Sequence, residues 1–235
     1  MFFFSWTFLL LIPPMILAFY ASTKVRSTFV KYSQYRASSG ATGAQVARGI
    51  LDANGLVEVK VERIEGNLTD HFDPRKNVLR LSEPVYSSDS LAALGVAAHE
   101  AGHALQHAGG YVPLKARQGI WPVASFGSNL GPILAIVGIF VLQMTRGTHG
   151  MLIAEIGIGV FSLATVFTIL TLPVELNASR RALAALVDSG YVSQSERADA
   201  KKVLDAAALT YIAAAFVAVM QLLQLILIVM GSRRR

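Results

Sequence analysis

The chain has 235 residues, 53% of them hydrophobic, and a formal net charge of +6 at pH 7. This composition is too apolar for an ordinary soluble domain of this size and indicates an integral membrane protein. The absence of cysteine excludes disulfides, a thiolate metal site and a cysteine nucleophile, and no aromatic-basic pattern favours a nucleic-acid partner.

Four stretches are long enough to cross a bilayer as helices, at about 20 apolar residues per crossing. They are residues 2–20, 120–144, 151–172 and 206–230. Pro13 and Pro14 predict a kink in the first stretch. No positive charge precedes this stretch and no small-residue cleavage site ends it, so we interpret residues 1–21 as a retained transmembrane anchor rather than a cleaved signal peptide.

Lysine and arginine are unevenly distributed between the loops. Residues 22–119 carry 12 of them and residues 173–205 carry 5, whereas only Arg146 lies between the second and third stretches. The positive-inside rule therefore places both basic loops in the cytoplasm. The terminal SRRR would then lie outside, which the rule disfavours, and the sequence leaves open a last helix that is tilted or does not fully cross.

The long loop begins with a predicted amphipathic helix in the stretch TGAQVARGILDANG. Val46 and Ile50 recur at helical spacing, Thr42 and Gln45 form a capping-box pattern, and Gly55 is a stop signal.

A small three-stranded sheet is predicted next. The stretch LVEVKVERI (56–64) alternates valine with charged residues, which is typical of a half-buried strand, and NLTDHFDPRKNVLRLS (67–82) predicts a hairpin that turns at Asp73-Pro74. An edge of this hairpin either pairs with an extended substrate or is ordinary scaffold, and the sequence does not decide between them.

The stretch SSDSLAALGVAAHEAGHALQHAGG predicts a helix that ends at Gly109-Gly110. Residues four apart share one helix face, so His99 and His103 can bind one ion, and neutral imidazoles suit zinc. Glu100 is rotated away from this face and can contact a zinc-bound water as general base, which is the arrangement of an HExxH motif. The alternative is a polar stripe at a membrane interface, but such side chains are costly to bury unless something binds them.

A catalytic zinc requires a third protein ligand, and two residues compete for this role. His107 continues the same stripe but lies about 12 Å along the helix from His99, which favours a supporting or surface histidine. Glu175 begins a predicted helix just beyond the third stretch, on the same side of the membrane as the two histidines. Its alternative role is a favourable interaction with the dipole of that helix.

The three motifs AAHEAGHALQH, LTDHFDPRKNVLRLS and LPVELNASRRAL, in this order and between these apolar stretches, resemble the YugP family of bacterial neutral zinc metallopeptidases. The resemblance covers nearly the whole chain. That family is similar in plan to the HtpX and CAAX-type membrane proteases, whose third zinc ligand is a glutamate on a later helix. The resemblance implies His99, His103 and Glu175 as ligands of one zinc ion per chain and Glu100 as catalytic base.

The chain departs from these wider relatives at one position. Where they usually place an aspartate that orients a histidine ligand, this chain has Ser179, so Asn177 and Asp70 are further candidates for that support. Candidates for stabilising the oxyanion are His71, Arg180 and Arg181. The arginines alternatively contact headgroups or a carboxylate, and His71 is alternatively a turn residue.

The predicted fold is a mainly α integral membrane protein with about four transmembrane helices and a small α+β zincin-like metalloprotease domain. The predicted parts are the anchor (1–21), a cytoplasmic domain with the HExxH helix (22–119), a transmembrane hairpin (120–172), a cytoplasmic helical segment carrying Glu175 (173–205), and a C-terminal transmembrane helix with a basic tail (206–235).

The expected function is a zinc endopeptidase of the bacterial cytoplasmic membrane, with its site facing the cytoplasm and acting on membrane or unfolded proteins. Its expected partners are the bilayer, protein or peptide substrates, and further membrane proteins or copies of the chain. The alternative function is a non-catalytic, zinc-stabilised membrane adaptor or a regulator of proteases. The intact Glu100 favours the enzyme, because a purely structural zinc site has no use for a base beside its first ligand.

Overall fold

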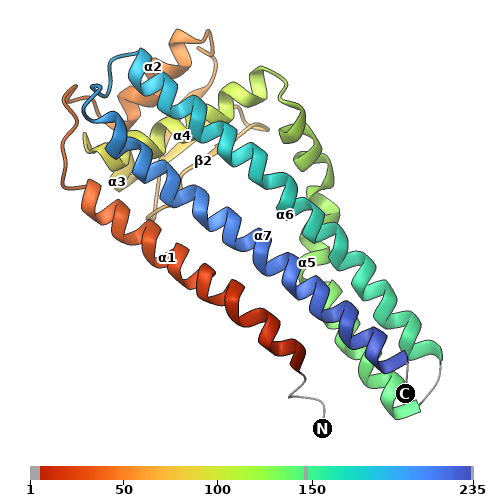
Figure 1. The fold of residues 1–235 in the computed structure, drawn as a ribbon. Coiled ribbons are helices and arrows are strands. Elements are labelled where there is room, and N and C mark those ends of the chain that lie inside the picture. The colour runs from red at the N-terminus through yellow and green to blue at the C-terminus, as the bar shows by residue number, and fades with distance from the viewer. Residues whose placement is uncertain (1–5, 146–147, 234–235) are drawn as a thin grey trace. The chain divides into compact units, whose positions relative to one another are not determined.

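The protein is described here by a computed structural model, which covers residues 6–145 and 148–233 and is mainly helical (Figure 1). In chain order its elements are η1 (Trp6–Leu11), α1 (Ile12–Tyr32), α2 (Gly43–Ala53), β1 (Lys60–Ile64), β2 (His71–Asp73), β3 (Val78–Ser82), α3 (Glu83–Tyr86), α4 (Leu91–Ala108), α5 (Val112–Thr145), α6 (Thr148–Asp188) and α7 (Arg197–Arg233). The chain forms two compact units. The membrane unit contains the described residues within 1–20, 116–172 and 211–235, and the site unit contains residues 21–115 and 173–210.

Within the described residues, four helical segments are long and apolar enough to cross a membrane. They are Trp6–Tyr32, Val112–Thr145, Thr148–Asp188 and Arg197–Ser232. Together with the small sheet, they confirm the predicted fold class of a mainly α membrane protein. Residues 2–5 of the first predicted stretch, Arg146 of the loop and Arg234 and Arg235 of the tail lie outside the described residues.

The helices extend further than the apolar stretches that predicted them. In particular, the prediction of a separate helix starting near Glu175 is wrong, because α6 runs without a break through Pro173 to Asp188. A proline removes only one backbone donor, and the helical hydrogen bonds on either side can persist. At the N-terminus, Pro13 and Pro14 lie in the first turn of α1, directly after the change from 3-10 to α helix.

Glycines bring α5 and α6 into close contact in the membrane unit. A Cβ added to Gly127 would lie 2.6 Å from the carbonyl oxygen of Val160, and one added to Gly131 would lie 2.8 Å from the backbone nitrogen of Phe161. Such distances are shorter than a real Cβ tolerates, so only glycine allows these backbones to approach. The small-residue spacing in the sequence therefore corresponds to a helix-packing face.

In the site unit, α2 has the predicted capping box: the Thr42 hydroxyl accepts from the Gln45 backbone, and the Gln45 side chain accepts from the Thr42 N–H. Gly55 follows the helix at φ +74°, a conformation that favours glycine. Ser193 and Glu196 form the same reciprocal pair of hydrogen bonds in the turn that precedes α7. The capping box predicted for α2 is confirmed.

The predicted three-stranded sheet is present, with strand order β1-β3-β2. β2 and β3 form the antiparallel hairpin, and β1 pairs with β3 in parallel, Lys60 opposite Val78. The first strand is shorter than predicted. Val57 is exposed and lies outside it, because a turn between Leu56 and Val59 precedes the strand and Arg48 donates hydrogen bonds to both of these carbonyls.

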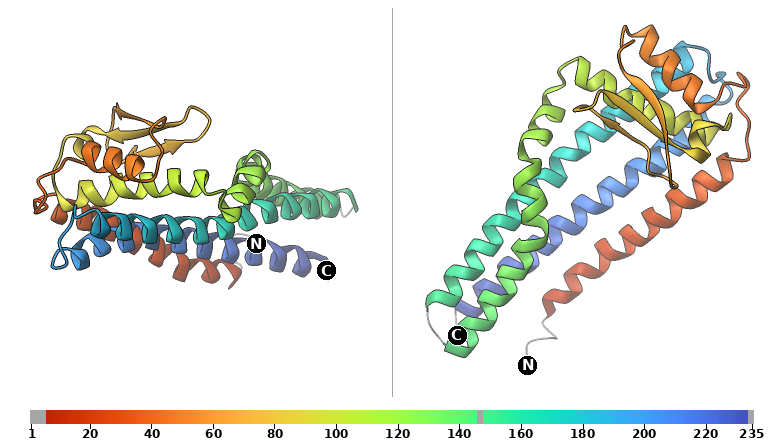
Figure 2. Two further views of the ribbon diagram at one scale, coloured as in Figure 1. Left: turned by 90° about the horizontal axis from the view of Figure 1, so that it is seen from above. Right: turned by 180° about the vertical axis from the view of Figure 1, so that it is seen from behind.

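α4 lies at the centre of the site unit, where it packs against α2, β2 and β3 (Figure 2). Ser90 caps its N-terminus by accepting from the Ala93 N–H, and its predicted end at Gly109-Gly110 is confirmed. Fully buried side chains from α2, β3, α3, α4 and α6 contribute to the core of the unit; the largest apolar ones are Val46, Ile50, Leu51, Leu79, Leu81, Val85, Leu94 and Leu186. The order of the sheet leaves β2 as an edge strand beside α4.

Candidate metal centre

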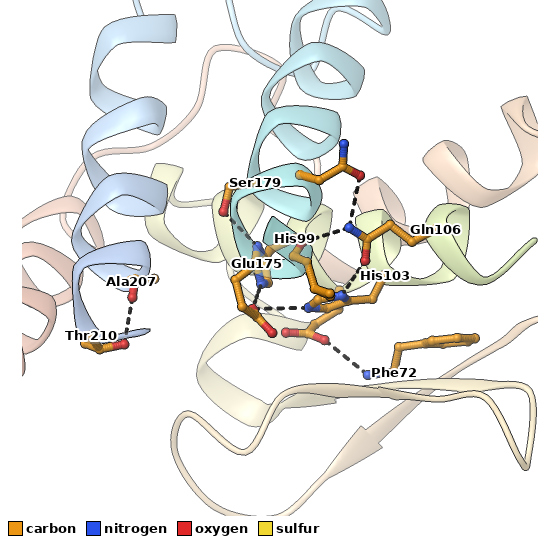
Figure 3. Close-up of polar contacts among 11 residues, drawn as sticks. Phe72, His99, His103, Gln106, Glu175, Ser179, Ala207 and Thr210 are labelled. Atoms are coloured by element: carbon orange, nitrogen blue, oxygen red, sulfur yellow. Dashed lines mark hydrogen bonds and ion pairs between the residues drawn. The ribbon is translucent and has the colours of Figure 1, made fainter. Parts of the chain in front are cut away.

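Two histidines of α4 and one glutamate of α6 converge in the site unit (Figure 3). The Glu175 Oε2 lies 3.2 Å from His99 Nε2 and 3.4 Å from His103 Nε2. The two imidazole rings meet edge to face, with centroids 4.8 Å apart. All three side chains are largely shielded from solvent, and Glu175 is 2% exposed. Helical spacing of four residues accounts for the histidine pair, and α6 supplies the carboxylate from a distant part of the chain.

These three side chains fit a zinc ion. One ligand atom from each of them lies within 4.8 Å of the others, and two imidazoles with one carboxylate form a donor set typical of zinc sites that keep a fourth position open. Among residues 6–145 and 148–233, no other group of three or more such side chains has this geometry.

Glu100 lies beside this group and contacts the sheet. Its residue is 9% exposed, and its Oε2 accepts a hydrogen bond of 3.1 Å from the backbone N–H of Phe72 on β2 (Figure 3). The edge strand therefore holds one oxygen of the carboxylate that the sequence identifies as the candidate base. A hydrogen bond to an ionised acceptor contributes about 1.5–3 kcal/mol, enough to restrict where this carboxylate points.

The pKa of His103 is raised above its ordinary value. Burial by itself lowers this pKa, but the hydrogen bond to Glu175 and the charges of Glu100 and Glu175 outweigh the effect of burial. In the metal-free protein the imidazole therefore holds a proton more tightly than a free histidine does. Since a metal needs the neutral imidazole, protons and metal compete for this residue.

The side chains that support the two histidines differ. Ser179, one of the candidate supporting residues, lies with its Oγ 3.2 Å from His99 Nδ1. Gln106, which the sequence analysis missed, lies with its Oε1 3.0 Å from His103 Nδ1 and is fully buried. Its signal in the sequence was a glutamine three residues after His103 on a helix that otherwise consists mostly of alanine, leucine and glycine.

The remaining predicted residues lie around this group without joining it. His71 is on β2 with its Nδ1 2.8 Å from the Thr69 carbonyl oxygen, and His107 is exposed, with its ring 5.9 Å from that of Phe72. Asp70 accepts hydrogen bonds from the backbone and hydroxyl of Ser82.

The predicted residues of α6 differ in their contacts. Arg180 is exposed and donates to the Leu176 carbonyl of its own helix. Arg181 donates from Nε to Asn177 Oδ1, and Asn177 also accepts from Gln106. Arg181 and Asn177 therefore lie behind His103 in one hydrogen-bonded network.

The close crossing of α4 and α6 depends on Gly102, between the two histidines. A Cβ there would lie 2.7 Å from the Ala178 carbonyl oxygen, so Gly102→Ala should force the helices apart at a cost of about 1–3 kcal/mol. We expect lower zinc content after purification and a lower melting temperature. Gly95→Ala, on the same helix, is the matched control, because its Cβ would meet only the Val203 side chain at 3.3 Å. Equal zinc content in the two variants would contradict the importance of this crossing.

The described part of the chain thus combines helices fit to span a membrane with a buried His-His-Glu group and an adjacent carboxylate. A family model described as "Putative neutral zinc metallopeptidase" matches residues 7–230, and the chain belongs to this family. It is 47% identical over 217 residues to the "Putative membrane protease YugP" of Bacillus subtilis (strain 168), covering 92% of this chain and 93% of that protein. The resemblance inferred from the three motifs is thereby confirmed. No solved structure matches the chain significantly.

Proposed function

We propose that the protein is an integral-membrane zinc endopeptidase in which His99, His103 and Glu175 hold one zinc ion and Glu100 is the catalytic base. The observation that carries the proposal is the convergence of two imidazole Nε2 atoms and one buried carboxylate beside a second carboxylate anchored by the edge strand. Zinc, when bound, supplies Lewis-acid chemistry that polarises the scissile carbonyl and activates the attacking water.

Glu100 performs the proton transfers. Its carboxylate accepts a proton from the attacking water and passes it to the departing amine, so that one side chain acts first as base and then as acid. The Phe72 N–H holds one carboxylate oxygen, leaving the other to face the water. Of the candidates for stabilising the oxyanion, His71 is the most suitable, because it neighbours Phe72 on the strand that contacts Glu100, whereas Arg181 is engaged with Asn177.

An extended segment of an unfolded or membrane protein is the substrate class that fits this arrangement. β2 is an edge strand of the sheet, and peptides commonly add to such edges by backbone hydrogen bonds. The distribution of basic residues supports a multi-pass protein of the bacterial cytoplasmic membrane with the site on the cytoplasmic side.

Metal removal tests the proposal. Protein purified in detergent should contain one zinc per chain and cleave an unfolded casein-type substrate; a chelator should abolish the cleavage and zinc should restore it. Magnesium should not restore it, because it prefers octahedral oxygen ligands over imidazole. The measurements are metal content by mass spectrometry and the rate of peptide release.

The alternative function is a non-catalytic adaptor in which zinc only joins α4 to α6. It predicts tightly held zinc and chelator-induced destabilisation with no cleavage of unfolded or membrane-protein substrates at any zinc concentration. Glu100 argues against this alternative, because a buried carboxylate that does not ligate the metal costs desolvation energy without stabilising a structural site.

A further inference from the structure

We propose that Gln106 is a positioning residue that fixes the tautomer of His103, so that its Nε2 is held as an acceptor toward the metal. The inference rests on the proposed function, since it concerns how one ligand of that site is oriented. It extends the proposal by assigning the orienting role to an uncharged side chain that comes from the metal-binding helix itself.

The orientation of the Gln106 amide follows from its partners. Its Nε2 lies 2.7 Å from the Val174 carbonyl oxygen, and a backbone carbonyl can only accept a hydrogen bond. The amide nitrogen must therefore face Val174, and the amide oxygen must face His103 Nδ1 at 3.0 Å. The reversed orientation would place two acceptors against each other in a fully buried position.

Arg181, at the other end of the network, supports the same orientation of the Gln106 amide. Asn177 Oδ1 accepts from Gln106 Nε2 at 3.0 Å and from Arg181 Nε at 2.8 Å. Because a guanidinium can only donate, it fixes the Asn177 oxygen as the acceptor and leaves the Gln106 nitrogen as the donor. The Val174 carbonyl only accepts and the Arg181 guanidinium only donates. Together they determine the direction of each hydrogen bond in the network between them.

The orientation of Gln106 determines which nitrogen of His103 carries the proton. Since Gln106 Oε1 can only accept, His103 Nδ1 must carry the proton, and in the neutral imidazole the lone pair then belongs to Nε2. Nε2 lies 3.4 Å from Glu175 Oε2, so its lone pair is available at the position where these side chains would bind the metal. In water, neutral histidine favours the other tautomer, so the protein has to impose this one.

Among the described residues, His99 has no comparable group that fixes its tautomer. Its Nδ1 faces the hydroxyl of Ser179, which can donate or accept and therefore dictates neither tautomer. The two histidine ligands are thus held unequally: a fully buried amide fixed at both ends orients His103, and a hydroxyl that can rotate contacts His99.

Three variants of the full-length protein test the inference. Gln106→Met keeps the approximate length and removes the three side-chain hydrogen bonds, whereas Gln106→Glu keeps an acceptor for His103 Nδ1 and loses the donor to Val174. Gln224→Met is the matched control, because Gln224 is also a buried glutamine, at 5% exposed, but lies in the membrane unit. Zinc affinity is measured by competition with a chelator, and the tautomer of His103 by nitrogen NMR of histidine-labelled, metal-free protein above the pH at which imidazole titrates.

We expect Gln106→Met to weaken zinc binding by about 10–100-fold, the usual effect of losing a group that orients a ligand. Its His103 should lose the Nδ1–H tautomer that the wild type shows. Gln106→Glu should restore that tautomer and most of the zinc affinity while remaining less stable to heat, and Gln224→Met should bind zinc as the wild type does.

Two outcomes would overturn the inference: an unchanged His103 tautomer in Gln106→Met, or equally weak zinc binding in Gln106→Met and Gln106→Glu, which is what a purely packing role predicts. If Gln106→Met does not fold, the comparison of Gln106→Glu with wild type still decides, because loss of the Nδ1–H tautomer there contradicts the assignment. The tautomer is read in metal-free protein and without substrate. The inference and the proposed peptidase activity can therefore fail separately.

Discussion

Glu100→Gln should lower kcat for peptide cleavage by about 10²–10⁴-fold, the usual contribution of a general base. The amide matches the carboxylate in size and its oxygen can still accept from the Phe72 N–H, so the local structure should remain. What it cannot do is take a proton from water. Because proton transfer matters only in the transition state, kcat and kcat/KM should fall together while KM changes little.

Zinc content is the essential second measurement on the same protein. Glu100 is not among the three side chains that converge, so Glu100→Gln should retain one zinc per chain and the thermal stability that zinc confers. Glu58→Gln is the matched control, since Glu58 is an exposed acid of the same unit. A Glu100→Gln variant that cleaves as fast as wild type would remove Glu100 from the catalytic role and favour the adaptor.

Local patterns made part of this architecture predictable. The capping box of α2, the cap of α4 and the glycines after both helices act within a few residues, so the sequence alone determines them. The HExxH spacing is local in the same sense, because the period of the helix alone brings His99 and His103 onto one face. The hairpin of β2 and β3 was predictable from Asp73-Pro74 and the alternation that follows.

Features that depend on contacts between distant segments were not predictable in the same way. The end of the third apolar stretch suggested a new helix near Glu175, but α6 continues through Pro173 to Asp188, and beyond the proline it packs closely on α4, with Ala178 against Gly102. Similarly, Val57 fits the alternation of a strand, yet the hydrogen bonds of Arg48 to the chain around it hold a turn there. In both places tertiary contacts overrode a local pattern.

Gln106 illustrates why supporting residues of a site escape a search for motifs. A glutamine in a helix is ordinary, and only its full burial and its partners on α6 give it meaning. The sequence predicted the orienting role for Ser179, Asn177 or Asp70 and not for Gln106. The structure brings the Ser179 hydroxyl to His99 and a different residue, from α4 itself, to His103.

Glu175→Ala should abolish stoichiometric zinc binding. Glu175 is the one carboxylate among the three side chains that converge, and without it two imidazoles remain, fewer than the three protein ligands that a catalytic zinc site needs. We expect the zinc dissociation constant to rise by more than about 100-fold, beyond what removal of a supporting residue costs. Peptide cleavage and the stabilisation by added zinc should disappear together.

The metal-free protein distinguishes a lost ligand from a lost fold. Without metal, Glu175 lies within 3.4 Å of both histidines, and it is one of the charges that raise the pKa of His103. Glu175→Ala removes this carboxylate and one cause of the raised pKa of His103, so that imidazole is not left as a buried charge without its partner. Melting temperatures of metal-free wild type and variant should therefore be close, whereas zinc should raise only that of the wild type. Glu155→Ala, at an exposed acid of the same helix, should still bind zinc; if Glu175→Ala does so too, the third ligand is another residue.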